Sequence, residues 1–486
     1  MNEEIRAQEP KILWNKFADL NEVPRPSKKE ERVIEFMKNF GNTLKLETIV
    51  DKVGNVIIKK PATSGMEDRK AVVLQSHLDM VHQKNNRTQF DFDTQGIQMY
   101  VDGDWVRARG TTLGADNGLG VATIMAILES DTIAHPAIEA LFTIDEETGM
   151  TGAKGLEPGL LKGGILLNLD TEEDDEIGIG CAGGVDVTAT RRYKEEETTE
   201  GMSAFKITLN GLQGGHSGMD IIKGLGNANK LMNRLLYNAS ENFGVRIAEI
   251  SGGGLRNAIP RESEATVLVD DFQIKAFESE LENEFESIQA EFLNLEPKMN
   301  LEVEKVEVPA KVMAMDTQEI LLKAVYAAHN GVFRMSPEIE GLVETSNNIA
   351  KVEVKNGTVN IKCLTRSSVE TSKDDLTNSL RAVFELAGFE VSLSGDYPGW
   401  APNRDSDILK VLDKLYTKLF NEKADVAACH AGLECGIIGS HYPEMDMISF
   451  GPTIRGAHSP DERASISSSQ KYWEFVLEIL KNIPKK

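Results

Sequence analysis

His77 and Asp79 close an apolar run that begins at Ala71, in the sequence AVVLQSHLDM. Residues two apart on an extended strand point to the same face, so both side chains could reach one site. Imidazole is a common metal ligand, and a neighbouring carboxylate can orient the ring through its second nitrogen. Taken alone, the pair is more typical of an ordinary surface or core histidine than of a metal ligand.

Carboxylates close two further apolar runs. Glu146 and Glu147 follow Asp145 at the end of ALFTIDEET, and Asp170 ends GGILLNLD. Such acidic runs are common in solvated turns, and we interpret residues 171–176, TEEDDE, in that way. At the end of a buried strand, however, like charges are costly unless a cation or a proton offsets them. Two strands that end in acid at one sheet edge therefore indicate a metal.

Asp116 and His458 lie in glycine-rich segments, GTTLGADNGLGVA and GPTIRGAHSPDE. Asp116 precedes an apolar helical run, where an aspartate is also an ordinary helix N-cap. The glycine spacing does not match a phosphate-binding loop, because no Lys-Ser or Lys-Thr follows and G-x-G-x-x-G is absent. His458, on a loop after a predicted strand, is ambiguous when taken alone.

As a set, these residues predict a hydrolytic centre. Two imidazoles and three carboxylates without thiolates suit two zinc, manganese or cobalt ions, with zinc the expected metal. If Asp116 bridges them, the ions could share a hydroxide of lowered pKa while one polarises a substrate carbonyl. Glu146 would then be the general base beside the ligand Glu147. Asp79 would hold the ring of His77.

Strands and helices must alternate to position these groups. The first 180 residues show that alternation and predict a mostly parallel sheet, at whose carboxyl edge functional residues collect. The expected strands are 56–59, 71–74, 140–144 and 164–169, and the expected helices 12–20 and 119–128.

From about residue 187 the pattern changes to longer alternating strands and two long acidic helices, near 272–293 and 372–387. This change predicts an α+β domain with its helices on one face of an antiparallel sheet, and Asn356-Gly357 predicts a hairpin turn. We therefore expect an α/β catalytic domain of residues 1–186 and 399–486, interrupted by an inserted domain of residues 187–398.

The composition makes some classes of partner and some cellular locations less favourable than others. With 53 Lys+Arg against 77 Asp+Glu, the net charge of −24 disfavours nucleic acid and anionic membranes as partners. The acidic start MNEEIRAQEP is unlike a signal peptide, and the longest apolar stretch is shorter than the roughly 20 residues of a membrane span. Four scattered cysteines without C-x-x-C favour a reducing compartment. We expect a cytoplasmic protein.

Seven motifs between residues 76 and 462 resemble the aminoacyl-histidine dipeptidases, or cytosol non-specific dipeptidases, relatives of carnosinase and aminoacylase. These motifs are SHLDMV, GADNG, DEETGMTGA, NLDTEE, GGHSG, HAGLECG and GPTIRGAHSPDE. The resemblance implies a discontinuous two-metal aminopeptidase-like catalytic domain with an inserted lid domain, hydrolysis of unblocked dipeptides, and a homodimer.

Carried over residue by residue, the resemblance assigns roles to single positions. Glu146 matches the general base and Asp79 the residue that orients the first histidine. The matching metal ligands are His77, Asp116 (the bridge), Glu147, Asp170 and His458. The matching substrate-binding positions are His216 (oxyanion), Asn257 (carbonyl), Arg366 (C-terminal carboxylate) and Glu434 (free amino group).

Two other functions stay open on the sequence. An N-acyl-amino-acid deacylase on the same fold would not need to recognise a free amino group, so Glu434 is the discriminating residue. A catalytically inactive binding protein could retain the fold, since fold does not imply function. The presence of Glu146 and of all five ligand types argues against the second alternative.

Overall fold

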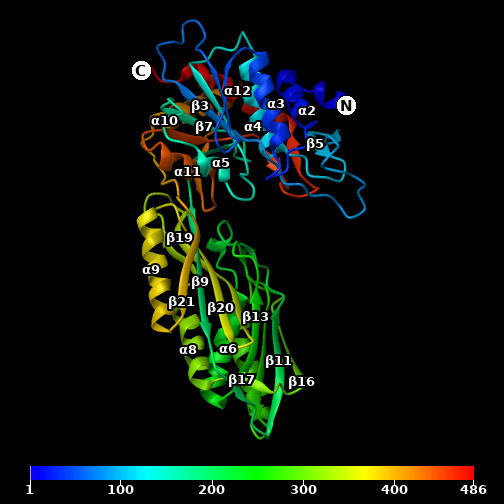
Figure 1. The fold of residues 1–486 in the computed structure, drawn as a ribbon, viewed down its shortest axis with the longest axis vertical. Helices are drawn as coiled ribbons and strands as arrows, with labels where there is room; N and C mark the ends of the chain where they lie inside the picture. Colours follow the sequence, from blue (N-terminus) through cyan, green and yellow to red (C-terminus); the bar gives the residue numbers. More distant parts are fainter. Residues whose placement is uncertain (1) are drawn as a thin grey trace. The chain divides into compact units, whose positions relative to one another are not determined.

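The computed structural model describes residues 2–486, which form two compact units (Figure 1). The first unit comprises residues up to 180, together with 400–428 and 433–486. The second comprises residues 181–399 and 429–432. The chain thus leaves the first unit after residue 180, builds most of the second, returns at residue 400 and enters the second unit again only for residues 429–432.

The first unit is built on an eight-stranded mixed sheet. Its strands run in the order β1 (Glu47–Val50), β2 (Val56–Lys60), β6 (Ile138–Thr143), β3 (Val72–His77), β7 (Ile165–Asn168), β23 (Asp446–Ser449), β8 (Glu176–Cys181) and β22 (Asp425–Cys429). The central strands β6, β3, β7 and β23 are mutually parallel. The expected mostly parallel sheet is therefore wrong at its edges, where β1, β2 and β8 pair antiparallel.

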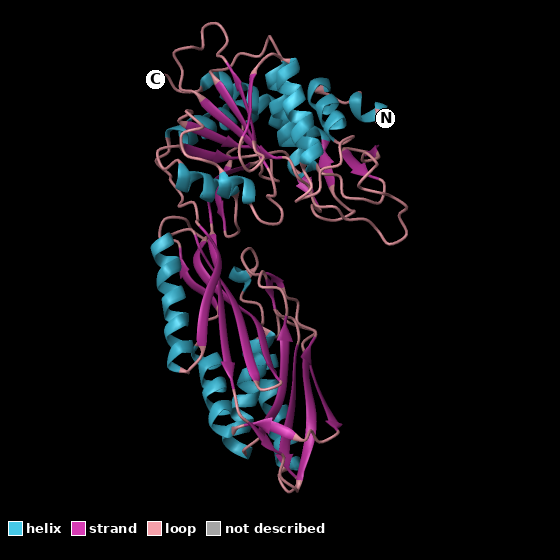
Figure 2. Cartoon of the chain, in the orientation of Figure 1, coloured by secondary structure: helices cyan, strands magenta, loops and turns pink. Residues whose placement is uncertain are grey.

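Apolar sequence explains the parallel centre. Every residue of β3, β6 and β7 is buried, as expected for strands covered on both faces. Helix α4 contacts β3 and α10 contacts β23. The unit's main helices, visible in Figure 2, are α2 (Lys11–Leu20), α3 (Glu31–Thr43), α4 (Ala115–Glu129), α10 (Asp407–Phe420), α11 (Glu434–His441) and α12 (Ile466–Asn482).

A small four-stranded sheet lies beside this core in the first unit. Its order is β24 (Ile454–Arg455), β25 (Arg463–Ser465), β5 (Trp105–Ala108) and β4 (Met99–Asp102). The loop between β24 and β25 carries His458. Because the two strands pair antiparallel, this loop is a closed hairpin connection.

The second unit has a nine-stranded antiparallel sheet. Its order is β16 (Asn300–Val306), β11 (Met202–Asn210), β15 (Ser263–Asp270), β13 (Arg246–Gly253), β19 (Val343–Lys355), β20 (Thr358–Ser367), β9 (Gly183–Arg192) and β21 (Glu390–Tyr397), with β18 (Gly331–Met335) on β19. Alternate residues of β11, such as Phe205 and Ile207, join one core with the four helices. These helices are α6 (Ala228–Phe243), α7 (Ile274–Glu291), α8 (Met315–Ala327) and α9 (Glu370–Leu386).

The expected hairpin at Asn356-Gly357 is confirmed. Lys355 pairs with Thr358, and both turn residues have positive φ, as a two-residue hairpin turn requires. In the described part of the chain, no disulfide joins any of the four cysteines. Among residues 2–486 we find no helix whose length and apolar character would let it span a bilayer.

Candidate metal centre

Three neighbouring parallel strands end at the same edge of the central sheet, and the predicted site residues lie at or just after these ends. His77 ends β3, Glu146 and Glu147 follow β6, and Asp170 follows β7. The register of β3 with β6 and β7 brings these carboxyl ends together. The expectation that functional residues gather at this edge is thus met by the fold.

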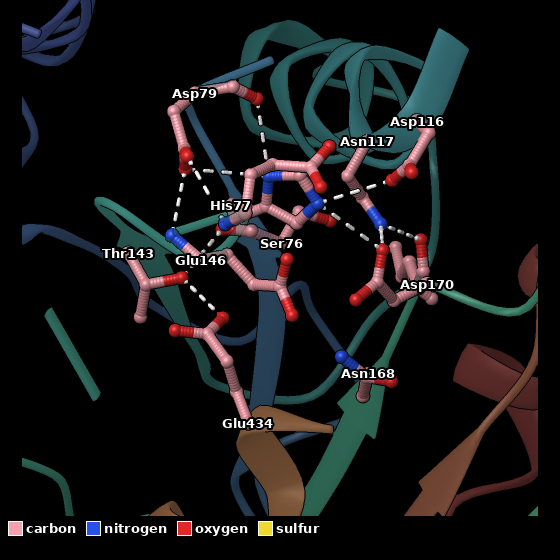
Figure 3. Close-up of polar contacts among 12 residues, drawn as sticks. Ser76, His77, Asp79, Asp116, Asn117, Thr143, Glu146, Asn168, Asp170 and Glu434 are labelled. Atoms are coloured by element: carbon pink, nitrogen blue, oxygen red, sulfur yellow. Dashed lines mark hydrogen bonds and ion pairs between the residues drawn. The ribbon is translucent and has the colours of Figure 1, made fainter. Parts of the chain in front are cut away.

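Asp116 lies between two histidines. Its Oδ1 is 3.1 Å from Nε2 of His77, and its Oδ2 is 3.1 Å from Nε2 of His458. The same nitrogen of His458 lies 2.9 Å from Glu147, and that of His77 lies 3.5 Å from Asp170. Figure 3 shows His77 directed between Asp116 and Asp170. The carboxylate of Asp116 therefore contributes one oxygen to a donor group around His77 and the other oxygen to a donor group around His458.

These donors form overlapping groups whose ligand atoms lie within 4.8 Å of one another. The groups are His77/Asp116/Asp170, Asp116/Glu147/His458 and His77/Glu146/Glu147. Among the described residues, buried Oε1 of Glu147 has no hydrogen-bond partner. Nitrogen and carboxylate donors at this spacing fit two divalent ions of the zinc type.

Without metal, groups of the site hold protons. Hydrogen bonds to Asp116 and Glu147 raise the pKa of His458 to about 11, so a proton takes the cation's place. Burial, reinforced by the charges of Asp170 and Glu434, raises the pKa of Glu146 well above its usual range. Bound divalent ions would supply positive charge to the four carboxylates around the two imidazoles, in place of the protons that these groups hold without metal.

Asp79 contacts both His77 and the backbone that carries Glu146 and Glu147. Its Oδ1 lies 3.4 Å from Nδ1 of His77, and its two oxygens accept the backbone N–H groups of Glu146 (3.0 Å) and Glu147 (3.3 Å). The hydroxyl of Ser27 also donates to Asp79. This carboxylate therefore fixes the ring of the first histidine and the backbone turn that carries both glutamates.

Glu434 lies in a buried polar network in the first unit. Its Oε2 accepts hydrogen bonds from Gln75 (2.7 Å) and Thr143 (2.6 Å), while Oε1 has no partner among the described residues. Gln75 in turn accepts from Asn168, which accepts from Ser449. Burial raises the pKa of Glu434 from its usual 4.5 to about 8, although the hydrogen bond from Thr143 and the charge of His77 oppose this shift.

This pKa predicts a pH-dependent gain of stability in Glu434→Gln. The folded wild type holds the proton more tightly than the unfolded chain, so its unfolding free energy falls as pH rises from 4.5 to about 8. The glutamine variant lacks this loss and should gain about 1 kcal/mol per pH unit relative to wild type. Urea unfolding of both chelator-treated proteins across this range checks it; two parallel stability profiles would contradict it.

Three predicted substrate residues lie together in the second unit. His216, in β12 (Gly215–His216), pairs with β14 (Ala258–Ile259), which Asn257 precedes. Arg366, in β20, donates to Ser217 (3.4 Å) and to the hydroxyl of Tyr397 (2.9 Å). The fold thus gathers residues that are far apart in sequence.

The hydrogen bonds of His216 define its tautomer. Nδ1 accepts the backbone N–H groups of Gly218 (3.2 Å) and Met219 (3.1 Å). Burial, and the positive charge of Arg366, lower the pKa of His216, which keeps the ring neutral. The ring hydrogen is consequently on Nε2, and His216 is a hydrogen-bond donor at that atom.

The interpretation of residues 171–176 as a solvated loop is wrong for its central part. Burial, with the charges of Asp116 and Asp170, raises the pKa of Glu172 to about 8. Glu173 pairs with Arg455, and Asp174 pairs with Lys471. Nothing in the local acidic pattern distinguishes these partners, which come from the C-terminal part of the chain.

The model of peptidase family M20/M25/M40 matches residues 73–482. This match spans most of the chain and contains every residue of the site, and the chain belongs to this peptidase family. Its α/β fold is that of the family's two-metal catalytic architecture, as the sequence predicted.

Individual relatives agree with this assignment. The chain is 43% identical over 483 residues to the cytosol non-specific dipeptidase of Escherichia coli (strain K12), covering 99% of this chain and 100% of the relative. The crystal structure of an aminoacylhistidine dipeptidase from Vibrio alginolyticus superposes with a TM-score of 0.93 at 44% identity, covering 100% of this chain and 99% of that one. The aminopeptidase PepT from Bacillus cereus shares the fold, with a TM-score of 0.57 at 15% identity and coverage of 98% and 99%.

Proposed function

We propose that this protein is a metal-dependent dipeptidase that hydrolyses unblocked dipeptides, of the Xaa-His type and more broadly. The observation that carries the proposal is Asp116, whose two oxygens each face a different histidine. Names of two relatives, each covering nearly the whole chain, support the substrate class. The proposed ligands of two divalent ions are His77, Asp116, Glu147, Asp170 and His458.

The chain's own groups would act around the scissile bond. Two bound divalent ions supply polarisation of a carbonyl group and a lowered pKa for water. Glu146 takes the proton of the attacking water and passes it to the leaving amine, as a general base and then a general acid. Asp79 keeps Glu146 in reach because it holds that residue's backbone N–H at 3.0 Å.

Residues of the second unit would bind the rest of the substrate, and we propose that this unit is a lid. Nε2 of His216 donates a hydrogen bond to the oxyanion. This hydrogen bond stabilises the transition state more than the bound substrate, because the negative charge develops only there. The planar guanidinium of Arg366 suits the C-terminal carboxylate, and Asn257 would hold a carbonyl. In the first unit, the unpartnered Oε1 of Glu434 is the proposed acceptor for the free amino group.

His216→Ala should lower kcat by about 10²- to 10³-fold, because one oxyanion donor is lost. Metal content should stay at the wild-type value, since this side chain is not a proposed ligand. Steady-state kinetics and metal analysis of the same preparation check both. His329→Ala, which removes another half-buried histidine of the second unit, is the matched control and should keep its kcat. Loss of the ions in His216→Ala would contradict its assignment.

The proposed function is tested by a substrate panel on chelator-treated protein before and after addition of zinc, manganese or cobalt. The panel contains Gly-His, β-alanyl-histidine, Leu-Leu, N-acetyl-leucine and Leu-Gly-Gly. We expect metal-dependent cleavage of the free dipeptides alone. Cleavage of N-acetyl-leucine alone would establish a deacylase instead, and no cleavage with any metal would favour a binding protein.

Three further properties belong to the same proposal. Zinc is the ion we favour, because imidazole and carboxylate ligands suit it, with manganese and cobalt as alternatives. A cytoplasmic location is supported by the name of the Escherichia coli relative. The homodimer remains a prediction from the family resemblance, which the mass in solution would check.

A further inference from the structure

Glu462 is a buried carboxylate to which the sequence assigned no role. Its side chain is 2% exposed. Oε2 accepts the backbone N–H groups of Leu113 (2.7 Å) and Gly114 (3.0 Å), and Oε1 accepts those of Ala115 (2.8 Å) and Asp116 (3.3 Å). Four consecutive N–H groups that lead into α4 therefore point at one carboxylate.

The same residue closes the loop that carries His458. The backbone N–H of Glu462 donates to the carbonyl of Ser459 at 3.0 Å, which makes a tight turn directly after His458. His458 itself has a φ of +63°, a left-handed conformation that a histidine keeps only when its surroundings hold it. Glu462 thus ties the loop of one proposed ligand to the backbone of another.

Arg25 completes the connection from the other side of the Asp116 segment. Its fully buried guanidinium donates to the carbonyl of Gly114 (2.6 Å) and to those of Leu78 (3.0 Å) and Asp79 (3.2 Å). A Cβ at position 114 would lie 2.6 Å from this guanidinium, and Gly114 has a φ of +70°, so the close approach requires glycine. The segment before Asp116 is consequently held between the buried guanidinium of Arg25 and the buried carboxyl group of Glu462.

From this geometry we infer that Glu462 is a positioning residue for the second metal ion, the one that Asp116, Glu147 and His458 would share. The inference rests on the proposed two-metal function. Glu462 sets the separation of Asp116, at the start of α4, and His458, on the loop between β24 and β25. His77 and Asp170 end neighbouring strands and are placed by the sheet. Loss of Glu462 should therefore weaken the second ion far more than the first.

Glu462→Gln tests this inference, because the amide keeps the shape but presents N–H donors to backbone N–H groups. Equilibrium dialysis of chelator-treated protein against zinc alone gives the affinity of each ion. We expect a loss of about 10- to 100-fold in the affinity of the second ion, the range seen when outer-shell partners of a metal site are changed. The spectrum of bound cobalt should change in parallel.

Glu139→Gln is the matched control. Glu139 is a buried glutamate of the same unit that accepts two backbone N–H groups, from Lys162 and Gly163, near the opposite end of β6. It should bind both ions as wild type does. Combining Glu462→Gln with His458→Ala should weaken the second ion no more than His458→Ala alone, since Glu462 acts through that loop.

The outcomes separate this inference from the proposed function. Wild type that binds fewer than two ions would overturn the proposed two-metal function itself. If wild type binds two ions and Glu462→Gln binds both with unchanged affinity, only the role of Glu462 is overturned. Equal weakening of both ions by Glu462→Gln and Glu139→Gln would also overturn it, because that pattern reports general destabilisation. If Glu462→Gln does not fold, Glu462→Asp, which keeps both oxygens on a shorter side chain, must give the same selective loss.

Discussion

Glu146→Gln should lower kcat by about 10²- to 10⁴-fold and still bind two divalent ions. Glutamine retains the shape of the side chain but cannot accept a proton from water. The buried position of Glu146 raises its pKa in the metal-free protein, and the backbone hydrogen bond to Asp79 holds it in place. The measurement is kcat at saturating dipeptide, with metal content determined on the same sample; Glu146→Ala should behave alike.

The adjacent glutamate supplies the control. Glu147 differs from Glu146 by one position, yet its Oε2 lies 2.9 Å from Nε2 of His458, within the proposed second ion site. Glu147→Gln should therefore lose metal as well as activity, whereas Glu146→Gln should lose activity alone. A kcat of Glu146→Gln equal to that of wild type would remove Glu146 as the base. Loss of both ions in that variant would make it a ligand instead.

Asp116→Asn should reduce the affinity of at least one of the two ions by more than the ~10- to 100-fold typical of outer-shell changes, and activity should fall with it. The reason is geometric, because one carboxylate faces His77 with Oδ1 and His458 with Oδ2. An amide offers only one ligating oxygen, so one of the two positions must lose its donor. Zinc titration of the chelator-treated variant gives both affinities.

Asp446→Asn is the control for removing a carboxylate from this unit. Asp446 begins β23 and accepts hydrogen bonds from Ser406 and Ile408, at the end of the parallel strands opposite the site. Its metal binding should equal that of wild type. If Asp116→Asn binds two ions as tightly as wild type does, Asp116 is not the bridge.

Local sequence patterns were enough to predict which strands form at the centre of the first unit's sheet and which residue types end them. Continuous apolar runs predicted β3, β6 and β7, because strands buried on both faces need apolar side chains throughout. The acids and the histidine that close these runs could be identified without coordinates. Asn356-Gly357 predicted its hairpin because only a few residues tolerate positive φ at both positions.

The sequence pattern did not predict which distant segments pair with one another. Strands β1 and β2, at one edge of the central sheet, pair antiparallel. This direction could not be predicted, because the sequence of a short apolar strand does not indicate whether its partner runs parallel or antiparallel. Glu172 belongs beside Asp116 and Asp170, although the surrounding acidic run is typical of a solvated loop.

The contacts that hold the backbone of the site in place became visible only in the tertiary structure. Arg25, Asp79 and Glu462 connect backbone groups that lie far apart in the chain, and each is an ordinary charged residue in its own neighbourhood. A charged side chain becomes a structural link only when burial removes water and supplies partners from other loops. Residue type and local spacing were thus sufficient to propose the reacting groups, whereas the contacts that hold these groups exist only after folding.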